Sequence, residues 1–341
     1  MKKFINENIF KENKPYDCIN LINDSYTINN TNNTFCVFKS INDLYFLIYS
    51  GQNNSIISFD LIANKKVNEI KNAHELDITF YRHYVDKNIK RDLIISVSSY
   101  DNSIKLWNIS NWECLLNLKK VYQNGTLISA CFFNYLNENY IISSNLAFMG
   151  NPDCIKIFDF NGKIVKKFYD YDHGTVFIDT YYDVHSDNYY IITANIGYSK
   201  SYDYNGGKLY KKYIDNENNL ELRLSILRLI NNKNEVIEMM ESDRSGYIRI
   251  WNFLSGLLLR KIRTSNYTIN CTYLYDNEYL FIGCDDKGIK IMNLKTGNFV
   301  KNLDAHNKRI LSMKIILHPI YGECLISQGG YDGQIKLWKR Q

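Results

Sequence analysis

One short pattern recurs along the whole sequence, and it constrains the possible fold more than any other feature. Each copy has a turn residue such as Asp, Asn or Gly, then an alternating apolar stretch that ends in an aromatic residue. The clearest copies are "YDNSIKLWNI" at 100–109, "RSGYIRIWNF" at 244–253 and "GQIKLW" at 333–338. Short alternating runs bounded by turn residues are typical of β-strands. The sequence therefore predicts a fold assembled from one repeated strand unit.

Seven copies can be aligned on the aromatic residue, or on the Met that replaces it once. The aligned positions are Phe59, Trp107, Phe158, Tyr202, Trp251, Met292 and Trp338, at intervals of 41 to 51 residues. Each copy also has an apolar strand before the motif, as in "RDLIISVSS", and most have a short strand after it, as in "WECLLNL". Repeats of roughly 40–45 residues with several strands each indicate a β-propeller of four-stranded blades.

On these motifs the chain resembles the WD-repeat (WD40) family, over about residues 16 to 341. The usual Trp-Asp pair appears here as Trp-Asn or Trp-Lys, or with Phe, Tyr or Met in place of Trp. The resemblance implies an all-β fold, a seven-bladed β-propeller of four-stranded antiparallel blades. It also implies that an N-terminal strand completes the last blade. The segment "CINLI" at 18–22 has the form of "CLLNL" at 114–118, so we expect about 17–22 to pair with 334–338.

These expectations divide the chain into two parts. Residues 1–15 form an N-terminal tail, and residues 16–341 form a single propeller. The closing strand is expected at about 17–22. The blades are expected to end near residues 71, 119, 168, 213, 263, 304 and 341.

Histidine, serine and aspartate recur with tryptophan, in an arrangement that superficially suggests a hydrolase. The two sets are His74, Ser96, Asp101 and Trp107, and His306, Ser327, Asp332 and Trp338. In both copies the Ser lies eleven residues and the Asp six residues before the Trp. A catalytic triad is needed once, beside one oxyanion hole. A set that repeats around a ring resembles instead the family's buried structural network, in which polar groups are paired with one another.

Other site chemistry finds little support in the sequence. The six histidines form no HxxxH or HExxH motif, the eight cysteines form no CxxC pair, and no Gly-rich phosphate loop is present. We therefore expect no metal and no cofactor. The net charge of +5 gives no footprint for nucleic acid, and no segment approaches the ~20 apolar residues that span a bilayer. Scattered cysteines in apolar surroundings favour a reducing compartment, the cytoplasm or the nucleus.

Partner binding is expected on the top face of the ring, where the loops that precede the first strand and join the second and third strands gather. These loops carry the tyrosine and arginine residues that are enriched in binding hot spots. The candidate residues are Tyr100, Asp101, Phe148, Met149, Asp243, Arg244, Tyr267, Asp285, Lys287, Arg309 and Tyr331.

The sequence thus predicts a non-catalytic scaffold that binds peptides or other proteins. One alternative is a structural subunit of a larger complex that uses its blade edges. A propeller enzyme ranks behind both, because no unrepeated cluster of acid, base and nucleophile is present. A phosphoinositide-binding propeller also ranks behind them, because the Phe-Arg-Arg-Gly stretch of that subfamily is missing.

Overall fold

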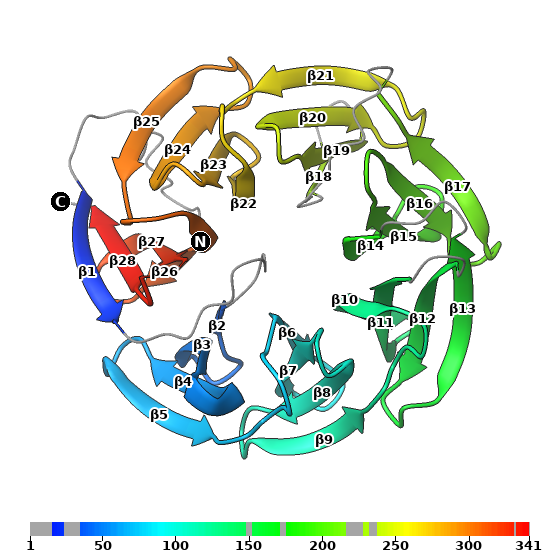
Figure 1. The fold of residues 1–341 in the computed structure, drawn as a ribbon, viewed down its shortest axis with the longest axis horizontal. Helices are drawn as coiled ribbons and strands as arrows, with labels where there is room; N and C mark the ends of the chain where they lie inside the picture. Colours follow the sequence, from blue (N-terminus) through cyan, green and yellow to red (C-terminus); the bar gives the residue numbers. More distant parts are fainter. Residues whose placement is uncertain are drawn as a thin grey trace.

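The structure, a computed structural model, describes residues 16–23, 35–147, 152–170, 175–215, 228–231, 237–330 and 332–340. These residues form seven four-stranded antiparallel sheets arranged as blades around a central axis (Figure 1). Among the described residues the only helix is the short 3-10 turn η1 (Gln52–Asn54). The predicted all-β, seven-bladed propeller is confirmed.

Six blades are built from four consecutive strands each. Blade 1 contains β2 (Phe35–Lys39), β3 (Tyr45–Gly51), β4 (Ser55–Asp60) and β5 (Lys65–Ile70), and blade 2 contains β6 (Phe80–Asp86), β7 (Arg91–Ser98), β8 (Ser103–Asn108) and β9 (Glu113–Leu118). Blade 3 contains β10 (Thr126–Tyr135), β11 (Glu138–Leu146), β12 (Asp153–Asp159) and β13 (Ile164–Asp170), and blade 4 contains β14 (Phe177–Asp183), β15 (Asn188–Ala194), β16 (Ser199–Asp203) and β17 (Lys208–Tyr213). Blade 5 contains β18 (Arg228–Asn231), β19 (Ile237–Ser242), β20 (Tyr247–Asn252) and β21 (Leu258–Arg263), and blade 6 contains β22 (Ile269–Tyr275), β23 (Tyr279–Cys284), β24 (Gly288–Asn293) and β25 (Phe299–Asp304).

Blade 7 combines the two ends of the chain. It contains β26 (Ile310–His318), β27 (Gly322–Gly329), β28 (Ile335–Arg340) and, outermost, β1 (Tyr16–Ile22). β1 runs antiparallel to β28, with Ile19 opposite Leu337 and Cys18 opposite Trp338. Figure 1 shows the two strands side by side, blue against red. The predicted closing strand is confirmed, and its pairing covers the edge that β28 would otherwise expose.

Burial falls from the inner strands of each blade to the outer ones. In β7 every residue after Arg91 is buried, whereas the outer strand β9 of the same blade has none that is fully buried. Leu93, Ile94 and Ile95 are wholly inaccessible because neighbouring blades cover both faces of β7. Each such side chain contributes roughly 1.5–3 kcal/mol of burial free energy. The core therefore lies between the blades and makes the ring one packed body.

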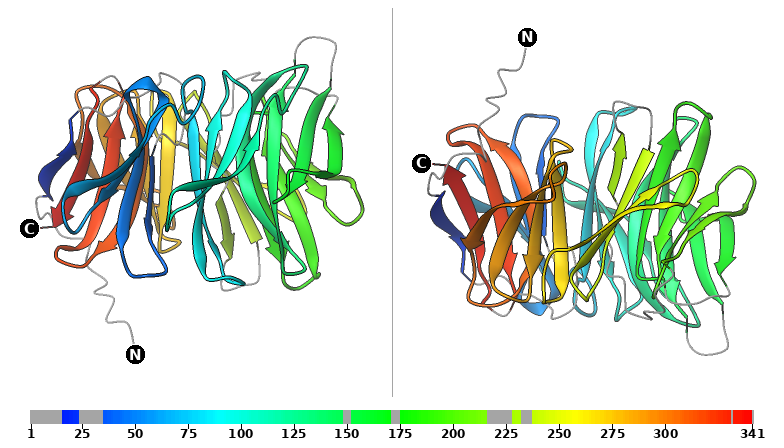
Figure 2. Two further views of the ribbon diagram at one scale, coloured as in Figure 1. Left: turned by 90° about the horizontal axis from the view of Figure 1, so that it is seen from below. Right: turned by 90° about the horizontal axis from the view of Figure 1, so that it is seen from above.

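The connecting loops gather on two opposite faces of the ring (Figure 2). The loops that enter each blade and those that join its second and third strands lie on one face, here called the top face. The other turns lie on the lower face. The outer strands of blades 1 to 6 end at Ile70, Leu118, Asp170, Tyr213, Arg263 and Asp304. Residues 1–15 lie outside the described residues.

Two further observations bear on the class of protein. No helix in the described part of the chain is long and apolar enough to cross a membrane. All eight cysteines are free thiols, and five of them are buried. In these positions a reduced thiol packs as a small apolar group.

Candidate partner-binding surface

Five of the predicted partner-binding residues lie exposed in top-face loops. Tyr100 is 61% exposed in the turn between β7 and β8, and Tyr267 is 54% exposed in the loop before β22. Arg244 is exposed between β19 and β20, and Asp285 and Lys287 are exposed between β23 and β24. These loops come from blades 2, 5 and 6, so the candidates are spread around the ring.

Arg309 is only partly exposed, in the loop that enters blade 7. Its carbonyl oxygen accepts a 2.7 Å hydrogen bond from the backbone N–H of Gly330, which joins this loop to the turn between β27 and β28. A side chain added at Gly330 would meet Cγ of Arg309 at 2.9 Å. This close approach fixes the position of the arginine stem. Phe148, Met149 and Tyr331 lie outside the described residues.

Two predicted contact residues, Asp101 and Asp243, point inward. The Asp101 side chain is 7% exposed and accepts hydrogen bonds from the Ser103 hydroxyl and from the backbone N–H of Glu75 at 3.0 Å. Asp243 is 1% exposed and forms an ion pair with the guanidinium of Arg249. Both carboxylates are occupied inside the ring, so the surface open to a partner is narrower than the predicted set.

In blade 2 a chain of hydrogen bonds connects tryptophan, serine and histidine. The Trp107 indole N–H donates to Ser96 Oγ at 2.8 Å, and Ser96 Oγ lies 2.7 Å from His74 Nε2. The other ring nitrogen, Nδ1, lies 2.7 Å from Ser103 Oγ. An indole can only donate, which leaves the Ser96 hydroxyl proton free to be donated to Nε2. This order of donors fits a neutral His74 with its proton on Nδ1.

The protonation states of this network agree with its geometry. Burial, partly offset by Asp101, lowers the pKa of His74 and so favours the neutral ring. Burial alone would raise the pKa of Asp101, but the nearby His74 ring and the hydrogen bond from Ser103 outweigh it and hold that pKa well below its ordinary value. The Ser96 hydroxyl is fully buried and already accepts from Trp107. These contacts suit a structural role better than nucleophilic attack.

Blade 7 repeats this hydrogen-bonded network, but no residue equivalent to Ser103 lies between the histidine and the aspartate. Trp338 donates to Ser327 Oγ at 2.8 Å, and Ser327 Oγ lies 2.8 Å from His306 Nε2. His306 Nδ1 lies 3.2 Å from Asp332, directly rather than through a serine. Burial opposes ionisation of Asp332, yet hydrogen bonds from His306 and from the backbone N–H of Gln334 lower its pKa. The same side chains thus tie the top-face turn to the core in two blades.

Blade 5 departs from this pattern although it carries the same Trp-Asn motif. The Trp251 indole nitrogen is buried without a hydrogen-bond partner. In blade 2, Ser96 lies opposite the basic residue Lys105 of the next strand. In blade 5 the equivalent residue is Glu241, which lies opposite Arg249. Arg249 is 2% exposed and pairs with Asp215 at 2.7 Å as well as with Asp243. A buried ionic cluster therefore replaces the neutral network.

This cluster is not among the sites predicted from the sequence, although the sequence carries a signal for it. A basic residue stands two positions before the aligned aromatic or Met in every copy except the first. These residues are Lys105, Lys156, Lys200, Arg249, Lys290 and Lys336. Each reaches back to the chain that enters its blade or to a nearby turn. Lys105 and Lys336 donate to the carbonyl oxygens of Ala73 and Ala305, at 2.5 and 2.9 Å.

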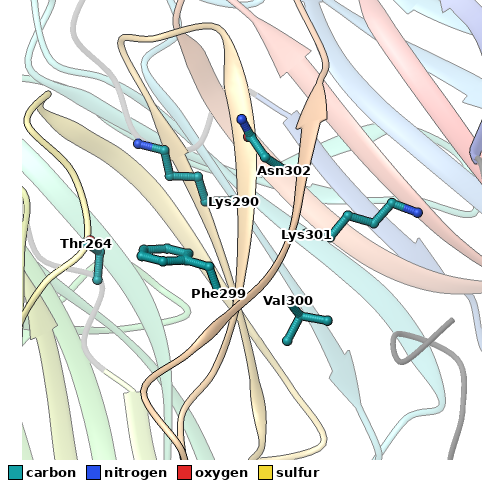
Figure 3. Close-up of a pocket in the computed structure, with 6 residues that line it drawn as sticks. All are labelled: Thr264, Lys290, Phe299, Val300, Lys301 and Asn302. Carbon is teal, nitrogen blue, oxygen red and sulfur yellow. The ribbon is translucent and has the colours of Figure 1, made fainter. Parts of the chain in front are cut away.

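Grooves lie between the outer strands of neighbouring blades at two places in the ring. One, with a volume of about 390 Å³, lies between blades 5 and 6. Phe299 and Lys290 extend toward Thr264 across it, whereas Lys301 points to the other side of β25 (Figure 3). The Lys290 ammonium is already paired with Asp286 at 2.7 Å. Across the described part of the chain, no group of three or more His, Cys, Asp or Glu could hold a metal ion.

Comparison with known proteins identifies the repeat. The family model described as "WD domain, G-beta repeat" matches residues 297–339. This stretch spans β25 to β28, so one sequence repeat joins the outer strand of blade 6 to three strands of blade 7.

Two curated relatives match shorter parts of the chain. The U3 small nucleolar RNA-associated protein 21 homolog of Schizosaccharomyces pombe is 24% identical over 110 residues, which are 32% of this chain and 12% of that protein. The COMPASS component SWD3 of Saccharomyces cerevisiae is 28% identical over 91 residues, 27% of this chain and 28% of that protein. The matches thus span less than a third of the length of either relative. The chain thus carries a WD40 repeat at 297–339 within a ring of seven four-stranded blades, and in this it is similar to WD-repeat β-propeller proteins.

Proposed function

We propose that this chain is a non-catalytic scaffold that binds peptides or protein surfaces through the loops of its top face. The proposal rests mainly on the observation that Tyr100, Arg244 and Tyr267 are exposed on loops of one face of a closed, packed ring. Tyrosine and arginine bury large areas at low cost in conformational entropy and are frequent hot-spot residues. Because the ring is already ordered, little additional ordering accompanies binding.

The relatives support a role in assemblies. One relative is, by its name, associated with a small nucleolar RNA, and the other is a component of COMPASS. We carry over from them only the general role of a protein-interaction module in a multisubunit setting. An intracellular location, cytoplasmic or nuclear, accords with this role and with eight free thiols. The partners proposed are proteins or peptides, without a cofactor.

Affinity capture with matched variants tests this proposal. We expect Tyr100→Ala combined with Tyr267→Ala to lose proteins that the wild-type ring recovers, with an unchanged melting temperature. Tyr321→Ala is the matched control, because this tyrosine is 41% exposed in a lower-face turn. Arg309→Glu extends the test to blade 7. If the double variant recovers the same proteins as the wild type, top-face binding is wrong.

A second candidate function, a structural subunit that contacts its complex through blade edges, rests on a different observation. Large apolar side chains are exposed on the outer strands of several blades. They include Val67, Leu209, Leu258, Leu259 and Phe299. Partners retained by the top-face variants but lost on Leu258→Ser combined with Phe299→Ser would favour this function.

A further inference from the structure

A second groove, between blades 2 and 3, is larger than the groove between blades 5 and 6 and is lined by more lysines. It has a volume of about 690 Å³ and runs from the end of β9, along the loop that enters blade 3, to β12 and β13. Four lysines line it, and no acidic side chain does so among the described residues. Lys119 is paired outside the groove with Glu75 at 2.8 Å. The other three, Lys120, Lys156 and Lys167, have no acidic partner within the described chain.

Two of these lysines face each other across adjacent strands. Lys156 on β12 is directly opposite Lys167 on β13. The Lys156 ammonium donates to the carbonyl oxygen of Val121 at 2.5 Å and lies 4.5 Å from the centre of the Tyr122 ring. Like charges directly opposite one another destabilise a sheet. Burial, together with the Lys167 charge, lowers the pKa of Lys156.

Blade 5 shows how the ring normally compensates such a pair. Arg249 lies opposite Lys261 in the equivalent register. Asp215, from the chain entering the blade, contacts Arg249 at 2.7 Å and Lys261 at 3.1 Å. The Asp215 carboxylate therefore forms ion pairs with both basic side chains.

The pair of basic residues in blade 4 also receives a carboxylate, and the pair in blade 3 does not. Lys200 lies opposite Lys212, and Asp170 at the end of the preceding blade contacts Lys200 at 2.5 Å. In blade 3 the residue in this place is Val121, which offers only its backbone carbonyl oxygen. The pair in blade 3 therefore lacks the carboxylate that its two counterparts have.

We propose that this groove binds an extended acidic segment of a protein partner, whose carboxylates neutralise Lys120, Lys156 and Lys167. The inference rests on the proposed scaffold function and adds a second surface to it. Tyr169 is 54% exposed and Ile164 38% exposed along β13, so the groove also offers apolar area for packing.

A nucleic acid fits this groove less well than a peptide. Strong binding to a phosphate backbone needs many contacts along an extended basic surface. Here the lysines are confined to one groove, and Glu75 stands at its rim beside Lys119. A short peptide fits within this limited length and can bring both carboxylates and apolar side chains.

Fluorescence anisotropy with the full chain tests the proposal. The probe is a labelled ten-residue peptide of alternating Glu and Ala, and a peptide with Gln in place of Glu serves as its neutral counterpart. We expect saturable binding of the Glu peptide that weakens as salt rises. Lys120→Glu combined with Lys167→Glu should weaken it by at least about tenfold, because both side chains are exposed and two attractions become repulsions.

The control is Lys65→Glu combined with Lys208→Glu. It makes the same change in net charge at exposed positions of β5 and β17. Unchanged binding in this control supports the groove, whereas an equal loss overturns it. Equal binding of the Gln peptide, or displacement of the Glu peptide by a single-stranded RNA decamer that binds more tightly, also overturns it. If the Glu peptide does not bind while the top-face tyrosine variants still lose protein partners, the groove is refuted and the scaffold function stands.

Discussion

Closure of the ring by β1 can be tested at a single side chain, Ile22. This residue is the last of the closing strand and is 7% exposed. It packs in one apolar cluster with Ile335 and Leu337 of blade 7 and with Leu47 of blade 1. Ile22 therefore belongs to the junction between the last blade and the first. Replacing it with alanine removes three carbon atoms from that junction without touching the backbone hydrogen bonds.

The expected cost follows from burial. Truncation of a buried isoleucine to alanine costs about 2–4 kcal/mol, because the transfer free energy of the lost atoms adds to the cavity that remains. Unfolding entropy scales with chain length at about 2.1 cal/mol/K per residue, so this loss lowers the melting temperature of a chain of this length by roughly 3–6 °C. The shift is small for a large protein, yet it is well within reach of calorimetry.

Differential scanning calorimetry and urea denaturation measure this effect. Asn20→Ala is the matched control, because Asn20 lies exposed on the same strand. We expect the control to melt within about 1 °C of the wild type. Deletion of residues 1–24 should destabilise the ring further and expose the edge of β28 to aggregation. If Ile22→Ala melts like Asn20→Ala, the closing strand does not stabilise the ring and the reasoning fails.

Three further predictions concern buried polar groups. Trp107→Phe should cost about 1 kcal/mol more in urea denaturation than Trp251→Phe, because only the Trp107 indole makes a hydrogen bond. Arg249→Met should cost about 3–5 kcal/mol in the same assay, because two carboxylates lose their buried counter-charge. Stability should fall as pH drops below about 6.5, because burial lowers the pKa of His74 and the unfolded chain then takes up the proton first. The difference in unfolding free energy between pH 7 and pH 5.5 should shrink in His74→Gln.

Each of these predictions has its own control. The two tryptophan variants control each other, and equal costs would show that the indole hydrogen bond adds nothing. Arg244→Met, at an exposed position, should stay within about 0.5 kcal/mol of the wild type. A loss of similar size for Arg249→Met would contradict the buried ion pairs. His185→Gln, in an exposed turn, should leave the pH dependence unchanged, and the same result for His74→Gln would refute the linkage.

Much of the fold could be predicted because the strand motif recurs at regular intervals along the sequence. The alternating residues before Trp107 and Trp338 define the same strand, and their spacing predicts the number of blades. The form shared by 18–22 and 114–118 predicts the closing strand, since both segments are outer strands of their blades. Fixed offsets from the tryptophans also pointed to the histidine and serine contacts now seen in blades 2 and 7.

The candidate binding surface was less predictable because loops carry no such period. Asp243 and Arg244 are neighbours in one turn, yet the first is buried in an ion pair and the second is exposed. Which of them faces solvent depends on Arg249, whose partner Asp215 comes from the chain entering the blade. Blades 2 and 5 share the Trp-Asn motif, so the motif alone does not predict that the Trp251 indole lacks a hydrogen-bond partner.

By itself the sequence determined the repeating strand unit, the number of blades and the joining of the two chain ends, because local alternation and regular spacing encode these. Only the tertiary structure decided which charges are compensated. The lysine pair of blade 3 and the arginine–lysine pair of blade 5 look alike in sequence, but a carboxylate reaches only the second. That carboxylate arrives from a segment more than thirty residues away, through packing that no local pattern records.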